Sequence, residues 1–443
     1  MSLARKAPFV VGSVFAVYAV LAAGCGTRES PEVATSSCTE IQFGGDGAPQ
    51  VFIASDLPLR GPTRPLSEQI VAAIQSELDA RGWRAGARTV GFRSCDNTTV
   101  STRASDAGTC AENAQTYADT AGLVGVIGTF SWACSAVMLP ILNRSDGGAV
   151  AMVSPTDTWP CLTRAVLGAC DDSEPDRFYP SGMRNYARVV PSDVSQGAFD
   201  AEFAKKIGVQ RVYVLSDGEP YGHAVATAFQ RAAEHLGIDI AGAESWDAAA
   251  PSHSMLFERV EQSGADAVFL GGTIDEHSAQ LLEDKVAVLG PNDGRVRLIA
   301  PAGFAQPAAL EAAGSAATGM FISSSGVPTR RLPAAARGLV DALQAGRLAG
   351  TTLDPVAVYG ALAARVLLDA IAASDGTRAD VIAKLFATHM NGPLGAISFD
   401  RNGDLTVVGG PISTWTMFVV RDGLEPDDSF SPGHETIAAA GAP

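Results

Sequence analysis

The sequence predicts an α/β protein made of two doubly wound lobes, each a parallel sheet with helices on both faces. Two observations lead to this fold class. Short apolar runs alternate with amphipathic helical segments from Val51 onward, and a second series of the same kind begins after ARVVPSD. Because the strands of such a sheet are buried on both faces, near-continuous apolar runs such as LVGVIGTF fit it better than a half-exposed antiparallel sheet.

The first lobe is expected at residues 50–189. VFIAS is its first strand, and the helix LSEQIVAAIQSELDARG places Leu66, Ile70 and Leu78 on one face before it ends at Gly82. RTVGFRS, LVGVIGTF and AVAMVS are the next strands, and CAENAQTYADT and CSAVMLPILN are the helices that alternate with them. The run AMVSPTDTWPCLT therefore marks the end of a buried strand.

The second lobe is expected at residues 190–325, where the strands RVYVLSD, ADAVFLGG, VRLIAPAG and GMFISSS alternate with helices. Residues 326–395 read as helices that are too few to fold alone, so we expect them to complete the first lobe. AISFD and ISTWTMFVV, within 396–425, are expected as closing strands of the second lobe, and 426–443 as a tail.

Composition limits the possible functions. A chain of 443 residues with 47% hydrophobic and 18% charged residues can fill two cores. Its formal net charge of -16 repels nucleic acid and anionic lipid, so neither is expected as a partner.

The N-terminus has the order of an export signal at residues 1–24. Arg5 and Lys6 precede the apolar run FVVGSVFAVYAVLAA, which is short for a membrane span and ends in small residues. VLAAGCG resembles the lipobox of bacterial lipoproteins, which implies that Cys25 is lipidated and holds the protein on the outer face of the cytoplasmic membrane. Plain secretion is the alternative. The polar segment at 25–49 is expected to be a flexible linker.

Cysteine usage agrees with export. Without Cys25, six of the seven cysteines remain, and an even number in an exported chain predicts three disulfides. The pair that flanks a short insertion, Cys161 and Cys170, is the one expected first. A metal site is the alternative, although no CxxC pair or neighbouring histidine supports it. The six candidates are Cys38, Cys95, Cys110, Cys134, Cys161 and Cys170.

Several blocks, in order, carry a family resemblance: VGVIGTF, MVSPTDTWPCLT, RVVPSDVSQG, VYVLSDGEPYG, ADAVFLGG and GPLGAISFDRNGDL. The chain resembles the type I periplasmic solute-binding proteins, which include the branched-chain amino-acid (Leu/Ile/Val) receptors of ABC transporters. The resemblance runs from about Val51 to Gly423. It implies two lobes joined by three crossovers, near 188–191, near 325–328 and before Ile397, about which the lobes close on a solute.

The same resemblance implies that the solute is handed to a membrane permease. No cofactor and no metal are expected, and the protein should act as a monomer. Two other functions remain open. One is a sensor that uses the same clamp to signal to a partner. The other is a cleft hydrolase, but the sequence has no GxSxG, HExxH or Walker motif, and His223 and His277 at helix starts are its nearest candidates.

Ligands of open parallel sheets bind beyond the carboxyl ends of the strands, where helix N-termini offer unpaired N–H groups. The segments that follow such ends, SWAC, PTDTW, DGEPYG and GTIDE, are rich in small polar and aromatic residues. Serine, threonine and aspartate there also cap helices, and indoles such as Trp159 often only pack. The candidate ligand-binding residues are Ser131, Trp132, Thr156, Asp157, Thr158, Tyr221, Thr273 and Ala302.

The resemblance also bears on the solute. Thr158 matches the threonine that holds a ligand carboxylate, but the family's amine-binding acid falls on Ala302. Asp157 or Asp275 is the alternative partner for an amine. Because a buried ammonium without a partner is costly, we expect the solute to be other than a branched-chain amino acid. An apolar or aromatic body with a polar or anionic end fits the nearby aromatic residues, including Phe304.

Overall fold

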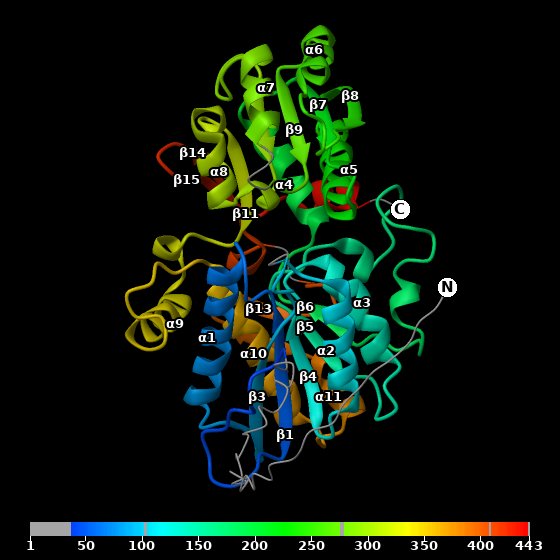
Figure 1. The fold of residues 1–443 in the computed structure, drawn as a ribbon, viewed down its shortest axis with the longest axis vertical. Helices are drawn as coiled ribbons and strands as arrows, with labels where there is room; N and C mark the ends of the chain where they lie inside the picture. Colours follow the sequence, from blue (N-terminus) through cyan, green and yellow to red (C-terminus); the bar gives the residue numbers. More distant parts are fainter. Residues whose placement is uncertain (1–36, 102–103, 275–278, 407–408, 442–443) are drawn as a thin grey trace, which may run out of the picture. The chain divides into compact units, whose positions relative to one another are not determined.

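The computed structural model describes residues 37–101, 104–274, 279–406 and 409–441 (Figure 1). The expected signal segment, Cys25 and the first part of the linker lie outside the described residues. Within 37–443, two α/β lobes follow the alternation of strands and helices in the sequence, so the predicted fold class is confirmed.

The first lobe has a six-stranded sheet in the order β2-β3-β1-β4-β5-β6, in which all neighbours except β2 and β3 are parallel. Helices α2 and α3 share one apolar core with one face, and α1, α9, α10 and α11 share a second core with the other. The strands are β1 (Val51–Leu57), β2 (Arg84–Ala85), β3 (Arg88–Asp96), β4 (Leu123–Gly128), β5 (Ala151–Ser154) and β6 (Tyr186–Arg188). The helices are α1 (Arg64–Ala80), α2 (Ala107–Asp119), α3 (Trp132–Asn143), α9 (Ala334–Ala345), α10 (Val356–Ala373) and α11 (Arg378–Phe386).

The second lobe has a seven-stranded sheet in the order β15-β14-β11-β10-β9-β7-β8, parallel except for β14 and β15. Helices α4, α5 and α12 pack on one face, and α6, α7 and α8 on the other. The strands are β7 (Arg211–Ser216), β8 (Asp239–Ser245), β9 (Ala267–Gly271), β10 (Arg297–Ala300), β11 (Phe321–Ser325), β14 (Trp415–Val420) and β15 (Leu424–Phe430). The helices are α4 (Asp193–Lys206), α5 (Pro220–His235), α6 (Ser254–Ser263), α7 (Ala279–Leu289), α8 (Pro307–Ala313) and α12 (His434–Ala440).

The C-terminal region differs from the expectation in two ways. AISFD does not join the second sheet, because β12 (His389–Gly392) and β13 (Gly395–Ser398) form a separate hairpin whose Ile397 is buried in the core of the first lobe. The chain therefore crosses back to the second lobe later, before Trp415. The expected tail is also folded, since it forms β15 and α12 and buries Ala440.

The expected linker ends earlier than residue 49. Gln42 exchanges two backbone hydrogen bonds with Phe92 at the edge of β3, and Cys38 lies opposite Cys95. The prediction of three disulfides, including the pair expected first, is confirmed. The disulfides are Cys38–Cys95, Cys110–Cys134 and Cys161–Cys170.

One helix among the described residues, α10, is long and apolar enough to cross a membrane. However, 72% of it is buried inside the protein, where it packs against α1 and α11 as a core helix.

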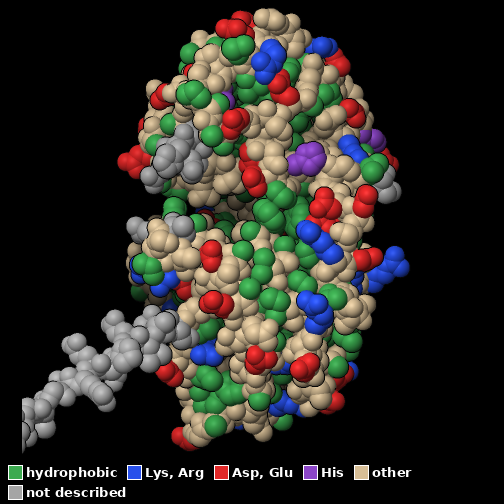
Figure 2. Space-filling view, turned by 45° about the vertical axis from the view of Figure 1, so that its right-hand side comes forward, with side chains coloured by type: hydrophobic (Ala, Val, Ile, Leu, Met, Phe, Trp, Pro, Cys, Tyr) green, Lys and Arg blue, Asp and Glu red, His purple; other side chains and the backbone are tan. Residues whose placement is uncertain are grey.

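On the face that Figure 2 shows, acidic and basic side chains are interspersed and form no continuous patch of one sign.

Arg188 ends β6, just before the first crossover, and its guanidinium is almost fully buried. Its Nε lies 2.9 Å from Asp404 Oδ1, in the turn that follows β13. Its Nη1 and Nη2 donate to the carbonyl oxygen of Asp157 and to the hydroxyl of Thr163, each at 2.9 Å. One side chain thus joins β6 to the β5–β6 connection at two points and to the turn after β13.

Replacing Arg188 should destabilise the protein strongly. Arg188→Met removes the buried cation beside Asp404 and leaves this carboxylate with the partly exposed Arg164 alone, and breaking a buried ion pair from one side costs about 3 to 5 kcal/mol. The matched control is Arg164→Met, because Arg164 also pairs with Asp404 but its side chain is 41% exposed. That variant should lose about 1 kcal/mol or less. Urea unfolding measures both, and equal losses would contradict the central role of Arg188.

Candidate functional site

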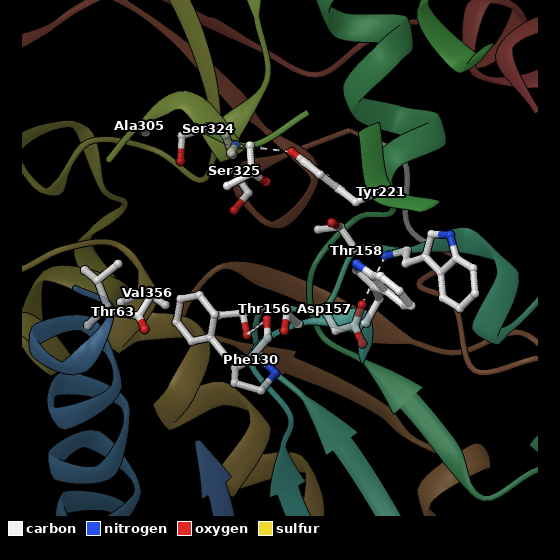
Figure 3. A pocket seen from close by; sticks show the side chains of 18 of the residues that line it. Thr63, Phe130, Thr156, Asp157, Thr158, Tyr221, Ala305, Ser324, Ser325 and Val356 are labelled. Carbon is white, nitrogen blue, oxygen red and sulfur yellow. Dashed lines mark hydrogen bonds between the residues drawn. The ribbon is translucent and has the colours of Figure 1, made fainter. Parts of the chain in front are cut away.

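A cavity of about 470 Å³ lies at the carboxyl ends of the strands of both sheets. Figure 3 shows Tyr221, Ser324 and Ser325 from the second lobe on one side, with Phe130 and Thr156 from the first lobe opposite them. All eight candidate ligand-binding residues line this cavity, because each follows a strand that ends at its edge: Ser131, Trp132, Thr156, Asp157, Thr158, Tyr221, Thr273 and Ala302.

The loop after β4 carries Ser131 and Trp132. Ser131 is the N-cap residue of α3, and its carbonyl accepts a hydrogen bond from the Thr129 hydroxyl at 2.7 Å. The Trp132 ring packs on Trp159 with ring centroids 5.4 Å apart, and Trp159 packs on Phe178 at 6.0 Å. The Trp132 indole therefore lines the cavity and is supported by its contact with the Trp159 ring.

Some polar side chains of the loop after β5 form hydrogen bonds with nearby backbone groups and so stabilise the turn. Thr156 donates from its hydroxyl to the carbonyl of Phe130 at 2.9 Å, and Asp157 accepts from the Trp159 amide at 3.1 Å. Burial raises the pKa of Asp157 above its usual range, against the opposing charge of Arg188. Turn formation thus accounts for part of the polar cluster that follows β5.

The facing wall comes from the second lobe. The Tyr221 oxygen accepts a hydrogen bond from the Gly303 amide at 3.2 Å, so its hydroxyl hydrogen remains available to an acceptor. Burial raises the pKa of Tyr221 well above its usual range, which keeps this donor neutral. Thr273 is exposed, and Ala302 begins a short 3₁₀ helix without offering a carboxylate.

Several cavity residues were missed by sequence reasoning. Ser324 and Ser325 end β11 in the SSS run, which was a usable signal, since it stands at a strand end like PTDTW. Four further lining residues lie within a helix or strand, or just before a helix, where the pattern predicts packing: Gln196, Asp354, Tyr359 and Trp415. The expectation for Phe304 was wrong, because its ring is fully buried beside Trp246.

Charge in the cavity is acidic. Among the described residues that line it, the ionisable acids are Asp157 and Asp354, and no lysine or arginine is present. Asp354 precedes α10, accepts from the Val356 amide at 2.9 Å, and burial raises its pKa. The alternative amine partner Asp275 and the histidine His277 lie outside the described residues.

Cys161, Cys170 and Glu174 lie close enough together to hold an ion, but the two sulfurs are joined in a disulfide. A disulfide sulfur offers no thiolate for a metal.

A further carboxyl lies behind the cavity wall. Asp193 begins α4 at the first crossover, its amide donates to the Thr158 carbonyl at 2.9 Å, and it is fully buried. Neither of its carboxylate oxygens has a well-aligned hydrogen bond. Burial raises its pKa from 3.8 to about 7, against the lowering influence of the Thr158 hydroxyl and of Arg188.

This burial predicts a pH-dependent stability. Between about pH 4 and pH 7 the folded protein keeps the Asp193 proton that the unfolded chain releases, so stability falls as the pH rises, by at most about 1.4 kcal/mol per pH unit. Asp193→Asn should remove this slope, and the stability difference from the native protein should level off above pH 7. Urea unfolding from pH 4 to pH 9 measures it.

Asp200→Asn is the comparison variant. Burial raises the pKa of Asp200 well above its usual range. The difference in unfolding free energy between Asp200→Asn and the native protein should therefore keep growing beyond pH 7. Parallel pH profiles for the native protein and Asp193→Asn would contradict the assignment.

Comparison with known proteins agrees with this geometry. A family model described as periplasmic binding protein matches residues 50–423. The chain is 24% identical over 280 residues to the leucine-, isoleucine-, valine-, threonine- and alanine-binding protein of Pseudomonas aeruginosa, across 61% of this chain and 67% of that protein.

Two solved structures share the fold. A leucine-binding protein from Thermotoga maritima superposes with a TM-score of 0.67 at 22% identity, covering 86% of this chain and 99% of that one. A solute-binding protein of an ABC transporter from R. palustris, in complex with 4-hydroxybenzoate, also gives a TM-score of 0.67, at 16% identity, covering 86% of this chain and 97% of that one.

Proposed function

Since the chain belongs to the periplasmic binding protein family, we propose that it captures a small solute between its two lobes and delivers it to an ABC importer. The observation that carries this proposal is the cavity itself, which residues of both lobes line at the strand ends. The relatives described above are binding proteins rather than enzymes, and the function is accordingly binding without turnover.

The walls favour a solute with an apolar or aromatic body and a polar end. Trp132, Phe130 and Tyr221 offer ring surfaces, and the hydroxyls of Thr158 and Ser324 offer hydrogen bonds. Ala302 provides no acid for an ammonium group. The relative that holds 4-hydroxybenzoate supports a solute of the aromatic-acid kind as strongly as the leucine-binding relatives support an amino acid.

Binding should close the lobes about the crossovers, which is the common response of two-lobed binding proteins. Small-angle scattering with and without a solute that raises the melting temperature tests this capture. A radius of gyration that stays unchanged at saturation would count against a clamp.

We expect leucine, isoleucine and valine to bind weakly or not at all. An α-ammonium group finds no acid at Ala302 and must rely on Asp157 or Asp354, whose carboxylates already accept hydrogen bonds from the Trp159 and Val356 amides. An incompletely paired buried charge costs several kcal/mol. Calorimetry with the three amino acids, beside 4-hydroxybenzoate and benzamide, measures the preference. Micromolar binding of any of the three would refute it.

A site variant separates this cavity from other binding surfaces. For whichever compound binds, Thr158→Val should weaken affinity about tenfold, since one hydrogen bond to the solute is lost. Thr116→Val is the matched control, because the Thr116 hydroxyl bonds within α2 on the exposed surface.

The location is part of the same proposal. Lipid at Cys25 would hold the receptor on the outer face of the cytoplasmic membrane, as a monomer beside the permease. Mass spectrometry of membrane-extracted protein should show Cys25 as the lipidated N-terminus. Cys25→Ser should move the protein to the soluble fraction, whereas an intact Met1 terminus would overturn the proposal.

A further inference from the structure

The connection between β5 and β6 contains a loop that the capture function does not explain. The Cys161–Cys170 disulfide closes this loop, residues 161–170, which we name the latch loop. It belongs to the first lobe by sequence, yet in Figure 1 the teal chain around it rises toward α5 of the second lobe. Hydrogen bonds show that the two are in contact.

The base of the latch loop is fixed to the first lobe. The Tyr179 hydroxyl donates to the Leu162 carbonyl at 2.6 Å, and the Thr163 hydroxyl donates to Asp404 at 3.0 Å. Val166 is buried in the core. These contacts and the disulfide leave the tip, Leu167 and Gly168, as the part that projects from a rigid base.

The tip is bonded to the second lobe. Arg231 Nη2 donates to the carbonyl of Leu167 at 2.7 Å, and the His223 Nε2 forms a hydrogen bond with the carbonyl of Gly168. Both side chains belong to α5, eight residues apart, and therefore project from neighbouring faces of that helix two turns apart. The Leu167 side chain remains 65% exposed, so it adds no buried apolar contact to these two hydrogen bonds.

The latch loop is also connected to the cavity. Its first residue follows closely after Trp159, which lines the cavity and lies between Trp132 and Phe178. Because these rings are packed in contact, a displacement of the loop base reaches the cavity wall directly.

We propose that the latch loop ties the two lobes together at a second place, away from the crossovers, and so sets the balance between lobe arrangements. The lobe arrangement in which Leu167 and Gly168 bond to α5 is favoured by both hydrogen bonds, and any rotation that separates the lobes must break them. Its consequence for solute affinity rests on the proposed capture function, because the balance of lobe arrangements determines how often a binding-competent cavity exists.

The test measures lobe separation without any solute. Dyes on noncanonical residues at positions 112 of α2 and 258 of α6, both exposed, report the distance between lobes by single-molecule energy transfer. Arg231→Ala and His223→Ala should each lower the ratio of the native arrangement to the separated one about threefold to tenfold, as expected for the loss of one hydrogen bond. Arg231→Lys, which retains a cationic donor, should restore part of it.

Gln230→Ala is the matched control, because the Gln230 side chain bonds to Glu234 within α5 itself. The proposal requires shifts for both Arg231→Ala and His223→Ala and none for the control. Unchanged distances in either variant, or an equal shift in Gln230→Ala, would overturn it. Since no solute is present, this result is independent of whether the proposed capture function holds.

Discussion

The buried guanidinium of Arg188 is the interaction on which the rest of the site depends. Removing such a charge from water is costly, so the group depends on partners that are held in fixed places. Its Nη1 and Nη2 donate hydrogen bonds, and its Nε faces Asp404 as an ion pair without a well-aligned hydrogen bond. Here the partners come from separate segments: Asp404 from the turn after β13, Thr163 from the latch loop, and the Asp157 carbonyl from the cavity loop. Because the buried guanidinium needs these partners, it holds the cavity loop in a fixed position relative to the first crossover.

The same desolvation shapes the electrostatics around the cavity. Asp157, Asp193 and Asp200 are all buried, and burial raises the pKa of each. Arg188 opposes this shift for Asp157 and Asp193, whereas the Ser323 hydroxyl opposes it for Asp200 on α4. Carboxyl groups held in their neutral form can donate hydrogen bonds as well as accept them. The acidic surroundings of the cavity are therefore less negative than their residue count implies.

Local sequence patterns predicted the buried strands and the candidate site residues. They did not predict features that depend on contacts between distant parts of the chain. Buried strands such as β4 and β9 were visible as apolar runs, and the eight site candidates converged because strand ends meet at one edge. β8 (Asp239–Ser245) escaped notice because it is a half-exposed edge strand with little apolar alternation. β13 belongs to the first lobe because Ile397 is buried in the core of that lobe. This is a tertiary contact, and the local sequence AISFD does not indicate it.

Fold similarity does not select the solute. Two relatives with the same TM-score of 0.67 are described with different compounds, leucine and 4-hydroxybenzoate, so the shared sheets supply the clamp and leave its chemistry open. In this chain the distinguishing residues lie on loops, where substitutions do not disturb the cores. The Trp132 ring packs against Trp159, which lies two residues before the disulfide-closed loop that contacts α5. In the function proposed above, the connection between β5 and β6 would therefore bear on both solute choice and lobe balance, because it carries Trp159 behind Trp132 and also bonds to α5 of the facing lobe.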